Sequence, residues 1–174
     1  MTDLRAHIRD IPDFPRPGIV YRDITPLLLE PEALAVAVGG LAAIARPLGV
    51  EYVVAAEARG FILGAALAIE IGAGFVPARK PGRLPHDTVS AEYVLEYGAD
   101  ALELHADALA HGERVLVHDD LLATGGTARA LCDLVTQLGG EVVACAFLVE
   151  LSFLAGREKL DGIPVHALVD YDTA

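Results

Sequence analysis

The sequence predicts an α/β fold built on a doubly wound, mostly parallel sheet with helices on both faces. Three observations lead to this prediction. Short apolar runs typical of strands alternate along the chain with longer segments of helical periodicity. The strand runs are continuously apolar, as expected for strands that are buried on both faces. Charged residues and glycines follow several of these runs, at the positions where ligands bind in open α/β sheets.

Length and composition indicate one compact domain. The chain has 174 residues, enough for a full core, and its formal net charge of −12 argues against general nucleic-acid binding. We expect no membrane-spanning segment, because a charged residue interrupts each apolar run, and the N-terminus lacks the apolar core of a signal peptide. Cys132 and Cys145 lie in apolar periodic segments, which favours buried free thiols and a cytoplasmic location.

The N-terminal part predicts little regular structure. Residues 1–14 are expected to form a short helix that ends at Pro12. Residues 14–26 contain three prolines and a glycine, which predicts an ordered but irregular segment. This segment carries Arg22 and Asp23. They are either a solvated charge pair on a surface loop or part of a lid over a ligand.

Alternating elements follow in the first half of the chain. They are a helix over residues 32–46, a strand over 52–56, a helix over 61–71 and a strand over 75–78. From residue 81 to about 100 the periodicity weakens, which predicts a long functional or mobile loop. Within it, residues 92–97 are expected to form one strand of a hairpin, and a short strand is expected over 102–104.

The second half returns to the same alternation. A buried strand ends near residue 117, and glycines lead from it into a helix over 127–138. A strand over 142–149, a short helical or irregular piece over 152–160 and a last strand over 163–169 complete the expected sheet.

The most informative stretch is VLVHDDLLATGGTA, residues 115–128. Two adjacent acids, Asp119 and Asp120, follow an apolar run, and a small-residue loop over 123–127 opens the helix. Free backbone N–H groups at a helix N-terminus suit a phosphate, whereas carboxylates suit hydroxyls or a metal. A ribose 5-phosphate satisfies both halves of the motif.

The glycine loop alone would be weak support, since it matches neither a Walker A loop nor a dinucleotide fingerprint. The acid pair strengthens it, because adjacent buried carboxylates repel each other and lose hydration unless a ligand or cation is present. His118, just before the acids, is expected to be a satisfied histidine that faces a neighbouring strand.

Several strand ends offer complementary chemistry. Carboxyl ends of parallel strands meet at one edge of a sheet. The expected ends are residues 57–60, 79–83, 119–127 and Glu150. Together they supply cations, carboxylates and backbone N–H groups, which suits a sugar that carries several phosphates.

The stretch VLVHDDLLATGGTA resembles the 5-phosphoribosyl-1-pyrophosphate (PRPP) motif of the type I phosphoribosyltransferases. The resemblance extends over nearly the whole chain and is strongest to the adenine branch of that family. Its other matching pieces are FPRPGIVYRDITPLL from residue 14, EARGF from 57, RKPGRLP from 79, EYVLEYG from 92 and VELSFLAGREKL from 149.

The resemblance implies a role for each part of the site. It implies that the 5-phosphate binds Ala123, Thr124, Gly125, Gly126 and Thr127 and that the ribose hydroxyls bind Asp119 and Asp120. It implies that pyrophosphate meets Ala58, Arg59 and Gly60, in a loop that often has a non-proline cis peptide, and Arg79, Lys80, Arg83 and His86. It implies purine contacts at Val20 and Arg22, and a catalytic set of Glu92, Tyr93 and Arg59.

The implied reaction is transfer of the phosphoribosyl group from PRPP to adenine, giving AMP and pyrophosphate in purine salvage. The resemblance implies Mg²⁺ as cofactor, held mainly by PRPP and water, and a homodimer, with no nucleic-acid or membrane partner. Residues 1–174 would form a single domain with a hood over 1–31 and a flexible catalytic loop over 80–100. Glu92 would exchange a proton with the purine, although a loop carboxylate is more often simply solvated.

Two alternatives stay open from the sequence. One is a phosphoribosyltransferase for another purine, xanthine or hypoxanthine. The hood around residues 20–22 argues against it, but base specificity depends on a few contacts. The other is a PRPP-sensing regulator that keeps the fold but binds nucleic acid. The acidic charge and the Glu92 segment argue against the second.

Overall fold

A computed structural model of the chain describes residues 2–95 and 98–173, and the side chains of all of these except residues 94, 95, 98 and 99. Its centre is a five-stranded sheet in the order β4-β3-β7-β8-β9, and every neighbouring pair is parallel. The strands are β3 (Tyr52–Ala56), β4 (Gly74–Ala78), β7 (Arg114–Leu122), β8 (Glu141–Leu151) and β9 (Val165–Tyr171). This confirms the predicted α/β class.

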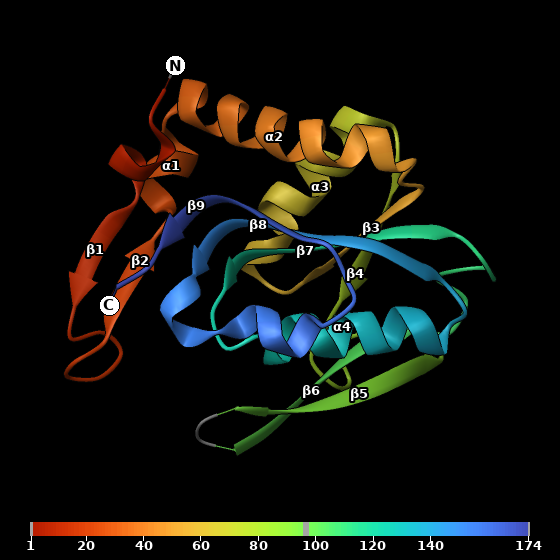
Figure 1. Cartoon of the computed structure of the whole chain (residues 1–174). Coiled ribbons are helices and arrows are strands. Elements are labelled where there is room, and N and C mark those ends of the chain that lie inside the picture. Colours follow the sequence, from red (N-terminus) through yellow and green to blue (C-terminus); the bar gives the residue numbers. More distant parts are fainter. Residues whose placement is uncertain (1, 96–97, 174) are drawn as a thin grey trace.

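Helices cover both faces of the sheet (Figure 1). On one face lie α2 (Pro31–Ala45) and α3 (Arg59–Ile71), and on the other lies α4 (Gly126–Gln137). Successive strand residues point to opposite faces, so Val53 joins the core under α2 and α3 while Val54 joins the core under α4. Burial on both sides explains why the strands are continuously apolar.

The chain order creates a switch point between β3 and β7. From β3 the chain passes through α3 to β4 on one side, and it later returns to β7 on the other side of β3. The segments that follow β3 and β7 therefore leave the same edge of the sheet in opposite directions and leave a crevice between them. These segments are the ones that carry Ala58, Arg59 and the 123–127 loop.

The long apolar segment at residues 31–48 corrects one expectation. Its 18 residues have a mean hydropathy of 1.3, so by length and composition it could span a membrane despite its charged residues. In the fold it forms α2 and the short helix η2 (Arg46–Leu48), and Ala37, Leu41 and Ala45 are fully buried in the core. These residues pack in the core, while 28% of the segment as a whole is buried.

Two antiparallel hairpins flank the sheet, and both differ from expectation. The first pairs β1 (Arg9–Pro12) with β2 (Val20–Asp23), where a helix and an irregular segment were expected. The helical part is only η1 (Leu4–His7), and α1 (Thr25–Leu29) follows β2. The partners of β1 lie beyond the proline-rich turn, so local periodicity carried no sign of the pairing.

The second hairpin replaces much of the long loop expected over residues 81–100. It pairs β5 (Thr88–Leu95) with β6 (Gly98–His105), and β6 contains the short strand expected over 102–104. The predicted strand at 92–97 thus overlaps β5, but residues 96 and 97 lie outside the described residues. Pairing between the two backbones keeps these segments extended, although their sequences have only a weak strand-like alternation of apolar residues.

The other elements lie close to the predicted residues, with one exception. The segment expected to be short and irregular consists of η3 (Ser152–Leu154) and η4 (Gly156–Leu160). The exception is β7, which continues through the acid pair to Leu122 instead of ending before it. Pairing of Asp119 and Leu121 with β8 keeps this part of the chain extended.

Candidate active site

The 123–127 loop forms a small cradle at the start of α4. A hollow of about 130 Å³ is lined by residues 121–128, so the structure brings together all five residues predicted for the 5-phosphate. Gly125 precedes α4 with φ +79°, a conformation that favours glycine, and no side chain caps the helix. The first N–H groups of α4 are therefore free to bind an anion.

The two acids sit beside this cradle in a poorly hydrated setting. Asp120 is 3% exposed, and its Oδ2 lies 3.1 Å from Arg59 Nε in an ion pair without good hydrogen-bond alignment. Burial, followed by the charge of Asp120, holds the pKa of Asp119 well above its usual range. Burial also raises the pKa of Asp120, although Arg59 opposes the shift. Donated hydroxyls or a cation would offset this cost.

Gly60 provides the space that Asp119 needs. A Cβ at residue 60 would lie 2.7 Å from Asp119 Oδ1, closer than real Cβ atoms approach other atoms. The same oxygen accepts a hydrogen bond from the Asp120 backbone N–H at 2.9 Å. The first turn of α3 and the acid pair of β7 are thus in direct contact across the crevice.

Arg59 connects the acid pair to the N-terminal hairpin. In addition to its ion pair with Asp120, its guanidinium donates a hydrogen bond to the Tyr21 hydroxyl. The guanidinium carbon also lies 5.1 Å from the centroid of the Tyr21 ring. The peptide bond between Glu57 and Ala58, just before α3, is cis, as the family resemblance implied. Arg59 therefore lies between the predicted ribose site and the predicted hood.

The ends of β3 and β4 are held together by Glu57. Its Oε1 accepts a hydrogen bond from the Lys80 backbone N–H at 2.7 Å and lies 3.3 Å from Arg79 Nε. Arg79 also donates to the Arg83 carbonyl at 3.1 Å. His86 is exposed, and the groups near it are Asp107, at 3.7 Å, and His105. Arg79 and Lys80 thus lie beside Glu57 at the carboxyl ends of β3 and β4. His86 lies instead near Asp107 and His105.

The hairpin brings Tyr93, but not Glu92, to this edge. The Tyr93 hydroxyl lies 3.4 Å from Lys80 Nζ and donates to Asp100 Oδ2 at 3.2 Å, while Lys80 forms an ion pair with Asp100. Neighbouring strand residues point in opposite directions. The Glu92 side chain is accordingly exposed, and it has no hydrogen-bond or ion-pair partner among the side chains that the structure describes, while its backbone pairs with Ala101.

A second, larger hollow adjoins the phosphate cradle. Its volume is about 400 Å³, and its lining is mostly apolar. It is lined by Gly18, Ile19, Val20, Tyr21, Arg22, Leu121, Ala123, Thr124, Leu151, Phe153 and Leu154. Val20 and Arg22 were predicted for the purine, whereas Leu121, Leu151, Phe153 and Leu154 were missed. The only signals for the missed residues were the resemblances of residues 115–128, which include Leu121, and of residues 149–160, which include the other three, and neither assigned them a role.

Arg22 has a structural partner on each side of its guanidinium. Its Nη1 lies 2.5 Å from Asp10 Oδ1, and its Cζ lies 4.1 Å from the Tyr171 ring centroid. The side chain is 6% exposed. Arg22 therefore lines the pocket while its charge is engaged in holding the hairpin.

His118 is fully buried next to the acids and, as expected, faces a neighbouring strand. Its Nδ1 lies 2.8 Å from the Ala146 carbonyl oxygen on β8, whereas Nε2 has no partner among the described residues. Burial lowers the pKa of His118 to about 4, so the ring is neutral at pH 7. The cysteines also match expectation: Cys132 and Cys145 are buried and free.

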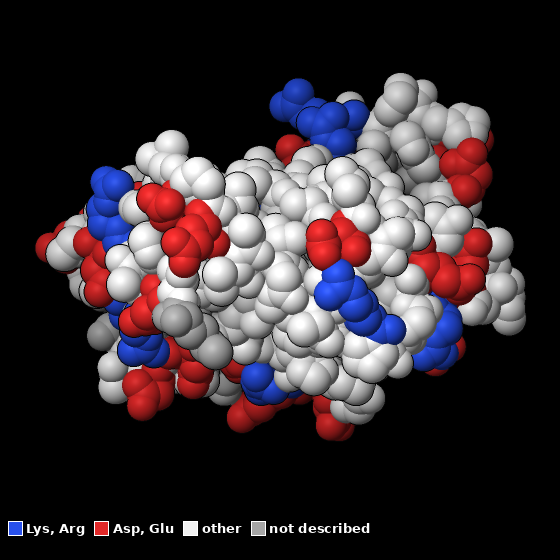
Figure 2. All heavy atoms as spheres, turned by 90° about the horizontal axis from the view of Figure 1, so that it is seen from above, with Lys and Arg blue, Asp and Glu red and all other residues white. Residues whose placement is uncertain are grey.

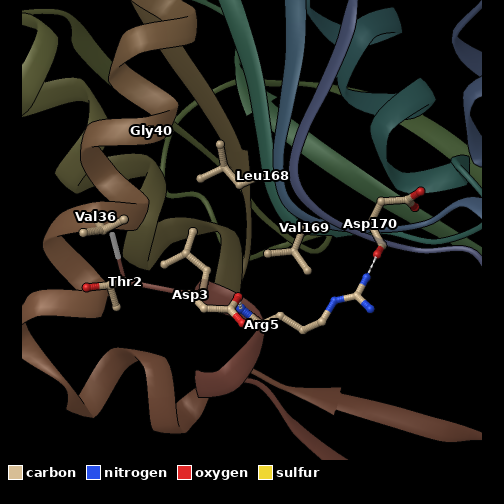
Figure 3. Close-up of a pocket in the computed structure, with 9 residues that line it drawn as sticks. Thr2, Asp3, Arg5, Val36, Gly40, Leu168, Val169 and Asp170 are labelled. Carbon is tan, nitrogen blue, oxygen red and sulfur yellow. Dashed lines mark hydrogen bonds between the residues drawn. The ribbon is translucent and has the colours of Figure 1, made fainter.

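A hollow larger than these two lies elsewhere. About 590 Å³ in volume, it is bounded by the N-terminal segment, α2 and the edge strand β9 (Figure 3). Arg5, its one basic group, donates a hydrogen bond to the Asp170 carbonyl and lies over the Tyr171 ring. Because this hollow has neither the acid pair nor the cradle, we place the candidate active site at the switch point.

Comparison with known proteins identifies the family of the chain. Residues 31–166 match the phosphoribosyl transferase domain. The chain therefore belongs to the phosphoribosyltransferase family.

Its relatives define the branch more narrowly as that of the adenine phosphoribosyltransferases. The enzyme of that name from Methylococcus capsulatus is 58% identical over 171 residues, covering 98% of this chain and 100% of the relative. The enzyme from Thermotoga maritima is 57% identical over 169 residues, covering 97% and 98%.

Solved structures give the same result. The adenine phosphoribosyltransferase of Thermoanaerobacter pseudethanolicus superposes with a TM-score of 0.94 at 50% identity, covering 97% of this chain and 98% of that one. The Saccharomyces cerevisiae enzyme, complexed with an imino-altritol bisphosphate and adenine, has a TM-score of 0.91 at 37% identity, covering 95% and 96%. The resemblance predicted from the sequence is confirmed.

Proposed function

We propose that this chain transfers the 5-phosphoribosyl group from PRPP to adenine, giving AMP and pyrophosphate. One observation carries the proposal. The phosphate cradle and the apolar pocket share Leu121, Ala123 and Thr124, so a phosphate and a flat base can bind side by side on one loop. The structure of the yeast relative, which holds a bisphosphate and adenine together, supports the same reading.

The donor would bind across the switch point. Residues 123–127 bind the 5-phosphate, and Asp119 and Asp120 accept hydrogen bonds from the ribose hydroxyls. Ala58, Arg59, Gly60, Arg79 and Lys80 meet the pyrophosphate, together with Arg83 and His86. The raised pKa values of the acids support this assignment, because a carboxylate that is costly to ionise alone gains most from donated hydroxyls.

The acceptor would lie between the N-terminal hairpin and the cradle. Val20 and Arg22 contact one side of the adenine, and the apolar lining excludes water from the reacting carbon. Partial positive charge develops on the ribose as its bond to pyrophosphate breaks, so water exclusion protects the sugar from hydrolysis. Arg59, Arg79 and Lys80 stabilise the charge that develops on the leaving pyrophosphate.

The transfer balances without a protein nucleophile. The anomeric C–O bond to pyrophosphate breaks, a C–N bond to adenine forms, and the adenine nitrogen loses its proton. Glu92 is the proposed acceptor of that proton, with Tyr93 beside Lys80 holding the hairpin at the sheet edge. Since Glu92 is exposed, the hairpin has to move over the base for this step, in accordance with a catalytic loop over 80–100.

Mg²⁺ is the proposed cofactor. Residues 2–95 and 98–173 contain no group of three or more His, Cys, Asp or Glu side chains that could hold a metal ion. The Oδ2 of Asp120 nevertheless has no hydrogen bond, although Arg59 lies 3.1 Å away, and a carboxylate oxygen of this kind suits a hard cation or its waters. PRPP and water would hold most of the ion, which neutralises phosphate charge when bound.

We propose one functional unit over residues 1–174, with a hood over 1–31, that acts in the cytoplasm as a homodimer. The buried free thiols support a reducing compartment.

An apolar face supports the dimer: Ile62 and Ile69 on α3 are 47% and 82% exposed. The face seen from the side of α2 has a broad area with few charges (Figure 2). Sedimentation of wild type and Ile69→Glu tests it, with a monomeric variant as the expected result.

A turnover panel tests the activity. Purified protein, PRPP and Mg²⁺ are incubated with adenine, hypoxanthine, guanine or xanthine, and nucleotide formation is measured. AMP from adenine at a rate far above the other bases is expected. Turnover of hypoxanthine or xanthine alone would support the other-purine reading, and retention of PRPP without turnover of any base would support a PRPP sensor.

A further inference from the structure

The short segment after β8 packs against the back of the phosphate cradle. A Cβ at Gly156 would lie 2.2 Å from the Ala123 carbonyl oxygen and 3.1 Å from the Gly125 nitrogen. A Cβ at Gly125 would lie 2.3 Å from the Gly156 carbonyl oxygen. The two backbones thus touch, and neither position has room for any side chain. The cradle rests directly on η4.

Arg157 holds this contact in place. Its Nε and Nη2 each donate a hydrogen bond of 2.6 Å to the two oxygens of Glu150, and its Nη1 donates to the Val165 carbonyl at 2.7 Å. The Glu150 side chain is only 4% exposed. A bidentate pair with a buried carboxylate fixes both distance and orientation, which a single ammonium group cannot do.

Glu150 links the pair to the strand that carries the acids. It lies opposite Leu122 in the register between β8 and β7, and Leu122 directly precedes the cradle. The start of η4 is therefore fixed to the sheet at the level of the cradle. At the other end of η4, Leu160 is 1% exposed in the core under α4. The segment is anchored on both sides of its contact with the loop.

We propose that Gly156 and the Glu150–Arg157 pair are positioning residues that hold the phosphate cradle in its anion-binding form. Glu150, Gly156 and Arg157 line neither hollow, and they act through the backbone contact of Gly156 with the loop. Phe153 and Leu154, just before them in the chain, line the base pocket. Loosening the pair lets η4 withdraw from Ala123 and Gly125, so the cradle loses its backing and its N–H groups lose their alignment. The inference rests on the proposed function, because it assigns PRPP to this cradle.

The test variant removes both charges together. Arg157→Met alone would leave a buried unpaired carboxylate and could unfold the chain. The double variant Glu150→Gln/Arg157→Met keeps volume and removes the bidentate pair. The matched control is Glu141→Gln/Arg114→Met, because that pair also joins the β7–β8 region, at 3.1 to 3.2 Å, but lies at the opposite end of the strands. Gly156→Ala tests the backbone contact independently.

Two readouts separate positioning from a loss of stability. Calorimetric titration with PRPP and Mg²⁺ should show a Kd at least about tenfold higher for the double variant and for Gly156→Ala, as expected for misplaced binding groups. The control should bind like wild type. Steady-state kinetics should show the KM for PRPP rising by a larger factor than the KM for adenine, since the segment touches the base pocket only through Phe153 and Leu154. The single variant Arg157→Lys keeps the positive charge but loses the paired donors of the guanidinium, so its affinity for PRPP should also be lower than that of wild type.

The proposal would be overturned if the folded double variant and the folded Gly156→Ala variant bound PRPP with wild-type affinity. It would also be overturned if the control variant lost as much PRPP affinity as the double variant. Failure of the proposed function has a different signature, since wild type would then form no AMP. PRPP affinity is measured without a base, so the positioning proposal is tested whichever base the protein uses.

Discussion

The guanidinium carbon of Arg22 lies 4.1 Å from the ring centroid of Tyr171. Arg22 belongs to the N-terminal hairpin and Tyr171 ends the last strand of the sheet, so this contact fixes the hairpin to the scaffold. Arg5 approaches the same ring to 4.4 Å. A desolvated cation–π contact contributes about 2 kcal/mol, enough to set the position of a small hairpin.

Tyr171→Leu should therefore weaken adenine binding. Without the ring, the hairpin that carries Val20 and Arg22 loses its anchor, and we expect the KM for adenine to rise about tenfold. Tyr171→Phe keeps the ring and should behave like wild type, since its contacts with Arg5 and Arg22 are to the ring. Equal KM values for adenine in the Leu and Phe variants would contradict the anchoring role.

Asp120→Asn should abolish efficient PRPP use while leaving the fold intact. The substitution removes the buried charge that faces Arg59 and the ribose site, and we expect kcat/KM to fall about a hundredfold or more, corresponding to roughly 3 kcal/mol. Because burial makes the charged carboxylate costly, the melting temperature of the free variant should not fall. The exposed Asp133→Asn on α4 is the control and should retain activity. An active Asp120→Asn enzyme would refute the assignment of the acid pair.

Gly60→Ala should impair PRPP use through a steric effect. Its methyl group would lie 2.7 Å from Asp119 Oδ1 and would displace that carboxylate or the start of α3. We expect at least a tenfold loss in kcat/KM. Gly39→Ala is the matched helix substitution, because a Cβ there meets no atom within 4 Å. It should raise the free energy of unfolding by about 0.5–1 kcal/mol without loss of activity, as measured by urea denaturation.

His118 should make the fold less stable in mild acid. Its pKa is about 4 in the folded chain, below the ordinary value of 6.5. Between these values the unfolded chain binds a proton that the folded chain does not, so the free energy of unfolding decreases as the pH falls from 6.5 toward 4. Above pH 6.5 the contribution is fully present.

The measurement compares urea unfolding of wild type and His118→Asn at pH 7 and pH 4.5. Wild type should lose about 2–3 kcal/mol more than the variant, given the linkage between pKa and stability. Asp119 and Asp120, whose pKa values are raised, act in the opposite direction in both proteins, so the difference isolates His118. Parallel losses in the two proteins would show that His118 does not titrate in this range.

The central sheet was predictable because its strands are defined by local sequence. Residues 52–56 were expected as a strand and form β3, since a run of apolar residues bounded by charged residues has few other ways to be buried. The hairpins were not predictable in this way. Arg9 pairs with Asp23, and their pairing depends on a turn that brings distant segments together.

The sequence by itself determined the α/β class, the acid pair beside a phosphate cradle and the basic residues at the ends of neighbouring strands. Each of these is encoded within a few consecutive residues, as periodicity, turn chemistry or charge. Only the tertiary structure decided that Phe153 and Leu154 line the pocket proposed for the base, that Tyr171 contacts Arg22 and that Gly156 contacts Gly125. These contacts join segments far apart in the chain, and local propensity carries no information about which distant backbone will lie within contact distance.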